Sequence, residues 1–322
     1  MSETLLVSFV IAAWNAGAFL EETVRSCLDQ TDARAQLEVV VTDDGSSDDT
    51  ARILRRLAES DARVRPNSFP ENRGKVAAYN DAFARSRGAF LAFMDADDVC
   101  LRDRVSASLR ALQENDAEML GGDAIILRGG EVISTSLARD WFGFHSDRAL
   151  DFDQLLKRPR VLGPTLFGTR AACEAAFPID ERLSHQDWWI PLAAAARRPI
   201  RHLDRPLVKY RLHASNTSRV NPGQTFDHWL RISAAEIHYY ERILEKFPLT
   251  PAQIAFCRER IRMFELLRMD RPAARWLAGA RTAPMALRGG IPLRERVKYL
   301  LAWASPRISH RLSMAAARRR TV

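Results

Sequence analysis

The sequence predicts an α/β protein built on a doubly wound, mainly parallel sheet. Apolar runs typical of buried strands alternate three times with amphipathic helical patterns in the first hundred residues. Such alternation favours parallel strands that are joined by helices. Two of the strand-like runs also end in clusters of aspartates. Because the carboxyl ends of parallel strands lie at one edge of a sheet, we expect these acids to converge on one crevice.

The expected elements follow from the spacing of apolar residues. Residues 5–13 form an apolar run that ends in a turn, and the apolar residues of 19–30 recur at the period of a helix. Further strands are expected at 37–41, 90–94 and 207–212, a hairpin at 124–134, and helices at 50–58, 76–85, 102–113 and 187–196. From residue 225 onward the pattern is helical and is broken by prolines.

The composition is ordinary for a globular protein. The chain of 322 residues can bury a full core, with 47% hydrophobic and 27% charged residues. No apolar run approaches the roughly 18 to 20 residues that span a bilayer. Residues 5–13 lack the basic leader of a signal peptide, so we expect a strand there. The four cysteines have no paired spacing, which indicates reduced thiols in the cytoplasm and no zinc site.

The net charge of +8 is concentrated near the C-terminus. Residues 281–322 contain ten basic residues and a single acid, Glu295. Apolar and aromatic residues lie among the arginines, as in a segment that rests on an anionic membrane surface. The same composition fits a helical cap whose arginines are solvated. We expect a cytoplasmic protein, which the first interpretation would place on the inner face of the membrane.

The chemistry is expected where the apolar run 90–94 ends. Asp95, Asp97 and Asp98 follow this run within four positions. A buried carboxylate without a partner is costly, so three together are expected to face a crevice at the carboxyl end of the strand. Oxygen ligands favour Mg²⁺ or Mn²⁺, and such an ion most often acts on phosphate. Capping of the helix at 102–113 would explain one of these acids but not three.

Five segments, taken in order, resemble the inverting glycosyltransferases of family 2, which have the GT-A fold. The matching segments are residues 10–15, 40–48, 72–80, 93–98 and 180–188. The resemblance covers residues 5–218, about two-thirds of the chain. Two residues depart from the family pattern. Ala12 replaces a proline, and Gln186 replaces the first acid of a Glu-Asp pair.

The resemblance implies a role for each of these segments. Asp43 would accept a hydrogen bond from the nucleotide base, with Trp14 packing on its ring. Asp97 would bind Mn²⁺ or Mg²⁺, and Asp187 would act as the general base. The complete implied site consists of Ala13, Trp14, Asn15, Asp43, Asp44, Lys75, Asp95 and Ala96 for the nucleotide, Asp97 and His213 for the metal, and Asp187 for catalysis.

The same residues also fit structural roles. The segment 43–46 has the composition of a turn and a helix cap, and Trp14 is equally compatible with the core. Asp187 could cap the apolar helix that follows it. His213 could be a structural histidine, and Lys75 an exposed cation at the start of a helix. The structure has to distinguish between these alternatives.

The combined expectation is a metal-dependent inverting glycosyltransferase. A sugar would pass from a nucleotide-sugar donor, expected to carry UDP, to a hydroxyl of a saccharide or lipid-linked acceptor in surface polysaccharide or glycan biosynthesis. The expected GT-A domain is 1–222, with a nucleotide-binding half at 1–120 and an acceptor-binding half at 121–222. A basic helical region is expected at 223–322.

Three other functions compete with this expectation. An apolar run followed by Asp95 and Asp97 also fits the nucleophile motif of haloacid-dehalogenase phosphatases, with an aspartyl-phosphate at Asp95. That motif normally lies on the first strand, whereas at least two strand-helix units precede it here. Nucleic-acid binding lacks a recognisable motif in the basic tail. A dehydrogenase lacks a glycine-rich loop after the first strand.

Overall fold

The computed structural model describes residues 5–31, 35–143, 147–183, 185–213, 216 and 226–268. The chain divides into two units, Met1–His213 and Ala214–Val322. The expected domain boundary at residue 222 lies outside the described residues. The division of the first unit into a nucleotide-binding and an acceptor-binding half stays a prediction.

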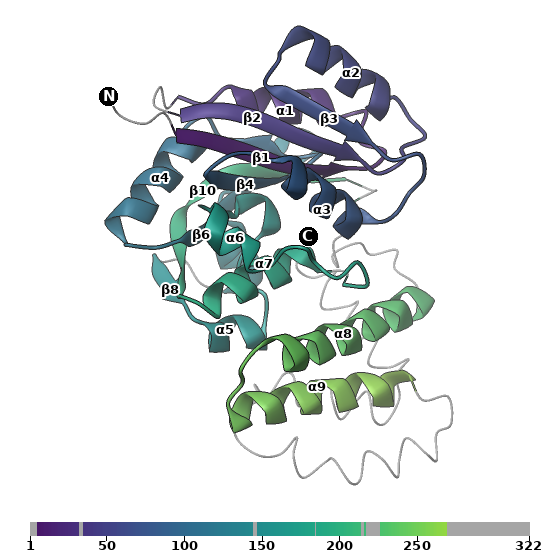
Figure 1. Cartoon of the computed structure of the whole chain (residues 1–322), viewed down its shortest axis with the longest axis vertical. Helices are drawn as coiled ribbons and strands as arrows, with labels where there is room; N and C mark the ends of the chain where they lie inside the picture. The colour runs from purple at the N-terminus through teal and green to yellow at the C-terminus, as the bar shows by residue number, and fades with distance from the viewer. Residues whose placement is uncertain are drawn as a thin grey trace. The chain divides into compact units, whose positions relative to one another are not determined.

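The first unit is built on one sheet with the strand order β3-β2-β1-β4-β9-β6-β10-β5, with β7 beside β6 and β8 beside β10. Figure 1 shows β1, β2 and β3 side by side in this sheet. Strands β3, β2, β1 and β4 are parallel neighbours, and β6 and β10 are also parallel. The strands are β1 Leu5–Ala13, β2 Ala35–Asp43, β3 Val64–Ser68, β4 Phe90–Asp95, β5 Val99–Cys100, β6 Met119–Arg128, β7 Glu131–Ser134, β8 Arg148–Leu150, β9 Phe167–Thr169 and β10 Ile200–Leu212.

The register of the parallel strands brings the acids to one edge of the sheet. Ala13, the last residue of β1, is the partner of Asp43 in β2, and its neighbour Ala12 is the partner of Asp95 in β4. The central parts of these three strands are continuously buried, as expected for strands that are covered on both faces. The predicted convergence of two acidic strand ends is therefore confirmed.

The helices connect the strands in the expected alternation. They are α1 Leu20–Leu28, α2 Thr50–Ser60, α3 Lys75–Arg85, α4 Arg104–Glu114, α5 Phe152–Lys157, α6 Arg170–Glu174 and α7 Gln186–Ala195, with a π-turn η1 Ala138–Phe142 and a 3₁₀ turn η2 Gly163–Thr165. The apolar residues Ile53, Leu54 and Leu57 of α2 are buried, as the helical period of the expected helix requires. The predicted hairpin is confirmed as β6 and β7, which are antiparallel.

Several short elements were not predicted: β3, β5, β8, β9, α5 and α6. β3 contains Arg65, Pro66 and Asn67, so it has no apolar run, and it lies at an edge of the sheet where one face can be polar. The predicted strand 207–212 begins earlier, at Ile200, and contains an irregularity between Leu203 and Val208. Polar and bulged segments of this kind carry little periodic signal.

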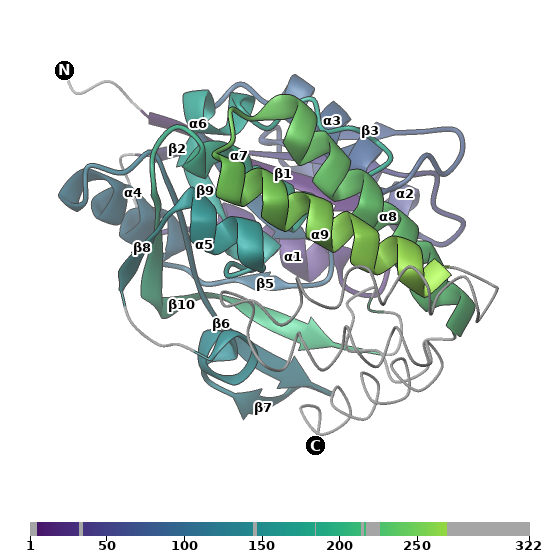
Figure 2. The same cartoon turned by 90° about the horizontal axis from the view of Figure 1, so that it is seen from below.

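The second unit contains two consecutive helices, α8 Phe226–Lys246 and α9 Pro251–Arg268. They lie side by side (Figure 2), and the ring of Tyr240 in α8 packs edge-on against Phe256 in α9 with centroids 6.1 Å apart. The predicted break near Pro248 and Pro251 is confirmed. Among the described helices, none is long and apolar enough to cross a membrane. The basic segment 281–322, and with it the membrane prediction, lies outside the described residues.

Candidate active site

The acidic motif forms a turn between β4 and β5. The hydroxyl of Thr23 in α1 lies 2.7 Å from the carbonyl oxygen of Asp98 and 3.0 Å from that of Ala96, so α1 fixes the backbone of the turn. The N-cap residue of α4 is Asp103. The alternative that Asp97 or Asp98 caps this helix is therefore wrong.

Three carboxylates of this turn lie together. One oxygen from each of Asp95, Asp97 and Asp98 can be chosen so that all three lie within 4.8 Å of one another. Asp95 and Asp97 are partly exposed. Asp98, in contrast, is fully buried, so the expectation that all three acids avoid the core is wrong for this residue. Its burial inside a turn that is closed by α1 and β10 could not be recognised from the motif.

The buried carboxylate of Asp98 is only half satisfied. Its Oδ1 accepts a hydrogen bond from the backbone N–H of Arg211 at 2.8 Å, whereas its Oδ2 makes no hydrogen bond to any described residue. Burial, together with the charges of Asp97 and Asp95, raises the pKa of Asp98 well above its usual range. An unsatisfied buried oxygen beside two partly exposed carboxylates fits a hard divalent cation, which binds oxygen ligands and would offset their repulsion.

His213 lies beside this carboxylate group. Its Nε2 is 2.8 Å from Oδ2 of Asp97, and its ring stacks on Phe19 with centroids 4.9 Å apart. The structure thus brings the two predicted metal-binding residues into contact, although they lie 116 positions apart in the chain. An imidazole nitrogen can bind a divalent transition-metal ion beside carboxylates. The position of His213 therefore fits the metal-binding role predicted for it.

Lys75 and Tyr79 lie against the first acid of the motif. Nζ of Lys75 is 2.8 Å from Oδ1 of Asp95. The hydroxyl of Tyr79 is 3.1 Å from the same oxygen and 3.0 Å from the carbonyl oxygen of Met94. Tyr79 is not among the site residues predicted from the sequence. The available signal was its spacing, because residues four apart on a helix share a face, but an aromatic residue in that position is also typical of a core.

Three carboxylates act electrostatically on Lys75 and Tyr79. Burial alone would lower the pKa of Lys75, but the charges of Asp95, Asp187 and Asp97 outweigh burial and raise it. Burial and the same three carboxylates raise the pKa of Tyr79 well above its usual range. Asp187, from the other half of the unit, is thus close enough to act electrostatically on the residues that contact the acidic motif.

Asp187 lies in the first turn of α7. It is the second residue of the helix, whose N-cap is His185, so the alternative that Asp187 is the cap is wrong. A Cβ atom on Gly163 would lie 2.9 Å from the Cβ of Asp187, so the absence of a side chain at Gly163 lets the backbone of η2 pass close to this acid. Gln186, which replaces the usual acid, is buried.

The segment that leads to Asp187 is held by α3. The side-chain amide of Asn80 donates to the carbonyl oxygen of Ile179 and accepts from its N–H, both at 2.8 Å. The ring of Phe83 stacks on Phe177 with centroids 3.9 Å apart. Helix α3 therefore contacts the acidic motif through Lys75 and the segment that leads to Asp187 through Asn80.

The predicted nucleotide wall lies at the carboxyl ends of β1 and β2. Trp14 is 55% exposed, so the core alternative for this residue is wrong. Asn15 has a left-handed φ of 48°, and its Oδ1 accepts a hydrogen bond from the N–H of Ser47 at 2.9 Å. This contact ties the loop after β1 to the loop after β2 and leaves the indole of Trp14 outside the core.

The carboxylates of Asp43 and Asp44 accept hydrogen bonds from two different segments. Oδ1 of Asp43 accepts from the N–H of Ser46 at 3.2 Å and from its hydroxyl. The two carboxylate oxygens of Asp44 accept from the N–H groups of Arg73 and Gly74 at 2.7 and 3.0 Å. The turn interpretation is confirmed for Asp43, whereas Asp44 holds the segment before α3. Neither acid caps α2, whose N-cap is Asp49, and the nucleotide-binding roles of both acids stay predictions.

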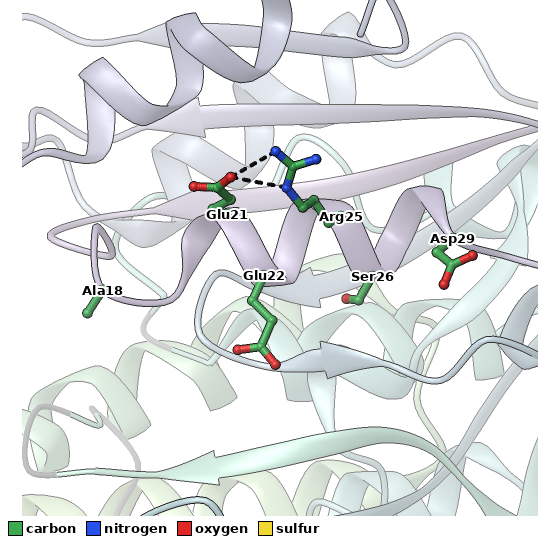
Figure 3. Close-up of a pocket in the computed structure, with 6 residues that line it drawn as sticks. All are labelled: Ala18, Glu21, Glu22, Arg25, Ser26 and Asp29. Atoms are coloured by element: carbon green, nitrogen blue, oxygen red, sulfur yellow. Dashed lines mark hydrogen bonds and ion pairs between the residues drawn. The ribbon is translucent and has the colours of Figure 1, made fainter. Parts of the chain in front are cut away.

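A separate hollow of about 550 Å³ lies on the outer side of α1 (Figure 3). Its lining consists of Ala18, Glu21, Glu22, Arg25, Ser26 and Asp29. Glu21 pairs with Arg25 across one turn of the helix, as the figure shows. None of the predicted site residues lines this hollow, so we do not include it in the candidate active site.

A mainly parallel sheet with acids at adjoining strand ends and a helix-borne acid opposite them defines a domain with the GT-A fold. The model of the family described as "Glycosyl transferase family 2" matches residues 8–168, half of the chain. The chain therefore belongs to glycosyltransferase family 2, and the predicted family is confirmed.

Among curated proteins, the chain is 30% identical over 153 residues to TuaG of Bacillus subtilis. The name of TuaG assigns it to teichuronic acid biosynthesis as a glycosyltransferase, and the match covers 47% of this chain and 57% of TuaG. It is 30% identical over 123 residues to the glycosyltransferase GlyG of Streptococcus pneumoniae, covering 38% and 40% of the two chains. The chain spans about half the length of the curated relatives it matches first.

Solved structures share the fold at low sequence identity. A fragment of S. aureus TarS, residues 1–349 in complex with UDP-GlcNAc, superposes with a TM-score of 0.60 at 15% identity, covering 98% of this chain and 92% of that one. The mannosyltransferase PcManGT from Pyrobaculum calidifontis, in complex with GDP-Man and Mn²⁺, gives a TM-score of 0.58 at 18% identity, covering 98% and 86%. These similarities establish the GT-A fold.

Proposed function

We propose that this protein is a metal-dependent inverting glycosyltransferase. It moves a sugar from a nucleotide-sugar donor, with UDP as the nucleotide, to a hydroxyl of a saccharide or lipid-linked acceptor. The observation that carries the proposal is the convergence of Asp95, Asp97 and Asp187 around Lys75. Family membership and the nucleotide-sugar complexes of two proteins with the same fold support it.

The donor is assigned to the edge formed by β1, β2 and β4. Trp14 is exposed beside this edge and offers a ring face on which a base can stack. Asp43 is assigned to the base and Asp95 to the ribose. Lys75 provides a cation next to Asp95 that can neutralise a phosphate oxygen of the donor.

A divalent cation is assigned to the carboxylates of Asp95, Asp97 and Asp98, with His213 beside Asp97. When bound, Mn²⁺ or Mg²⁺ supplies positive charge to the diphosphate as it leaves. The buried Oδ2 of Asp98, which makes no hydrogen bond to a described residue, supports the assignment. Asp98 is an addition to the ligands that the sequence predicted, and Asp95, predicted for the nucleotide, is assigned to the cation as well as to the ribose.

Asp187 is assigned the proton transfer. Its carboxylate takes the proton of the acceptor hydroxyl as the oxygen attacks the anomeric carbon, and the bond from that carbon to the diphosphate oxygen breaks on the opposite face. A single displacement of this kind inverts the anomeric configuration and needs one base. Gly163 has no side chain, so the backbone of η2 can pass close to Asp187.

The acceptor class is assigned from a curated relative, and the location from the basic segment near the C-terminus. The name of TuaG refers to teichuronic acid biosynthesis, which supports a role in surface polysaccharide or glycan biosynthesis. A position on the inner face of the membrane would depend on residues 281–322, outside the described part of the chain. The phosphatase alternative has no support, because the matching family and the shared fold are those of glycosyltransferases.

Calorimetric titration with UDP, GDP and dTDP, each with and without Mn²⁺, tests this proposal. We expect Mn²⁺-dependent binding of UDP that is lost in Asp97→Ala. Asp153→Ala, which removes an exposed acid of α5, is the matched control and should bind as the unmodified protein does. Binding of GDP or dTDP instead of UDP would overturn the proposed donor nucleotide. Absence of binding to all three would overturn the donor site.

A further inference from the structure

Lys75 occupies a position that a metal ion would also favour. It is the first residue of α3, and its Nζ lies 2.8 Å from Oδ1 of Asp95. Asp95 is also one of the three acids whose oxygens lie within 4.8 Å of one another. The ammonium of Lys75 and a divalent cation would therefore both be attracted to the negative charge of Asp95.

We propose that Lys75 competes with the divalent cation for Asp95 and thereby raises the metal concentration that the site needs before a donor is bound. This inference rests on the metal site of the proposed function. It concerns a different property of that site, namely how metal binding is coupled to donor binding.

The contacts around Lys75 allow such an exchange. Its side chain is 41% exposed, whereas that of Asp95 is 20% exposed, so the lysine can move away from the acid more easily than the acid can move. Tyr79 remains within hydrogen-bonding distance of Asp95 and of the backbone of Met94, and holds the acid in place. A lysine stem is flexible and its ammonium has no fixed geometry, unlike a guanidinium.

The direction of the exchange follows from charge. A donor brings a diphosphate, which is a stronger anionic partner for the ammonium than one carboxylate. If Lys75 turns to the diphosphate, Asp95 becomes available to the cation. Donor and metal would then each strengthen the binding of the other, and this reciprocity is required of any such coupling.

Binding of Mn²⁺ alone, followed by the electron paramagnetic resonance signal of the free ion, tests the competition without any nucleotide. In Lys75→Met, which keeps most of the stem and removes the charge, we expect roughly three- to tenfold tighter binding, in line with the loss of one partly exposed ion pair. Lys75→Arg keeps the charge and should bind Mn²⁺ as weakly as the unmodified protein. UDP should strengthen Mn²⁺ binding less in Lys75→Met than in the unmodified protein.

Two controls separate a direct contact from a general change in charge. Arg73→Gln removes a cation near the same helix that pairs with Glu181 at 3.6 Å, and Lys157→Met removes an exposed cation of α5. Both should change Mn²⁺ affinity by less than about twofold, because screening weakens charges that are not in contact. Thermal unfolding of each variant confirms that it is folded.

The outcomes are distinct. Unchanged or weaker Mn²⁺ binding in Lys75→Met would overturn the competition, while Mn²⁺-dependent UDP binding in the unmodified protein would leave the proposed function intact. Equally tight Mn²⁺ binding by the double variant Asp97→Ala/Lys75→Met would place the ion elsewhere and also overturn it. Absence of Mn²⁺ and UDP binding in every variant would overturn both proposals together.

Discussion

Nε2 of His213 lies 2.8 Å from Oδ2 of Asp97, although 116 residues separate the two in the chain. The contact is set by the backbone. In the antiparallel pairing of β5 with β10, Val208 is the partner of Cys100, and the N–H of Arg211 bonds to Oδ1 of Asp98. The end of β10 thus cannot leave the acidic motif without breaking these hydrogen bonds. The pairing of β10 in the sheet therefore places His213, the residue after its end, beside Asp97.

His213→Gln should raise the Mn²⁺ concentration needed for half-maximal activity by about 10- to 100-fold, the usual effect of losing a ligand's partner or a weak ligand. The imidazole both contacts Asp97 and fixes its orientation, and a glutamine cannot reproduce the stacking on Phe19. Steady-state rates across a Mn²⁺ series measure the change. His238→Gln, in α8, is the control. An unchanged Mn²⁺ dependence in His213→Gln would show that His213 is structural.

Asp187→Asn should lower kcat by about 10²- to 10⁴-fold, the range associated with a general base. The amide keeps the size and the place of the side chain beside Gly163 but cannot accept the acceptor's proton. UDP affinity in the presence of Mn²⁺ should change little, because Asp187 is not assigned to the donor. Glu174→Gln, on the exposed side of α6, is the matched control. A variant that retains most of its turnover would exclude Asp187 as the base.

The sequence contained the signals that place the acids at one edge. Continuous apolar runs define β1, β2 and β4, and parallel strands share a carboxyl edge, so the neighbourhood of Asp43 and Asp95 follows from the pattern alone. The identity of the general base rested on resemblance to a family. The placement of Asp187 near Lys75 depends on the contact between Asn80 of α3 and Ile179, which no local pattern encodes.

Other features depend on contacts between distant residues. The burial of Asp98 results from Thr23 and Arg211 closing on the turn from two sides, and neither residue carries a signal for this role. The pairing of Asn80 with Ile179 joins residues 99 positions apart. An asparagine on a helix face has many possible hydrogen-bond partners. The sequence can therefore place Asn80 in a motif, but it cannot show which segment Asn80 contacts.

Asn80→Ala tests this connection. The substitution leaves the N–H and the carbonyl oxygen of Ile179 without their partner, which should reduce the free energy of unfolding by about 1 to 3 kcal/mol. Because the loosened segment leads to Asp187, kcat should fall more than UDP affinity. Urea unfolding and steady-state kinetics measure the two effects. Asn115→Ala, which removes a local bond at the end of α4, is the control. Equal losses of kcat and UDP affinity would contradict a positioning role.

Acid should destabilise the first unit partly through Glu38, a buried residue near the middle of β2. Burial by itself would raise the pKa of Glu38. Hydrogen bonds from the hydroxyl of Ser8, from the N–H and guanidinium of Arg87, and from Arg65 outweigh burial and lower it.

The direction of the pH effect follows from this lowered pKa. A group whose pKa is lower in the folded than in the unfolded protein contributes stability that is present above the unfolded value, about 4.3 for Glu, and is lost as the pH falls through the folded value. The free energy of unfolding should therefore fall below about pH 5, and Glu38→Gln should flatten this fall.

At pH 7, Glu38→Gln should be less stable than the unmodified protein by about 1 to 3 kcal/mol, because its hydrogen bonds to two arginines no longer involve a charged acceptor. The two proteins should approach each other in stability as the pH falls below about 4.3, the unfolded pKa of Glu, and through the lower folded pKa of Glu38, because the carboxylate of the unmodified protein is then protonated. Urea unfolding followed by tryptophan fluorescence at several pH values gives both curves.

Glu131→Gln, on the exposed strand β7, should follow the unmodified protein throughout. Parallel curves for Glu38→Gln and the unmodified protein would mean that Glu38 titrates alike in the folded and unfolded chains, which its four hydrogen-bonded contacts argue against.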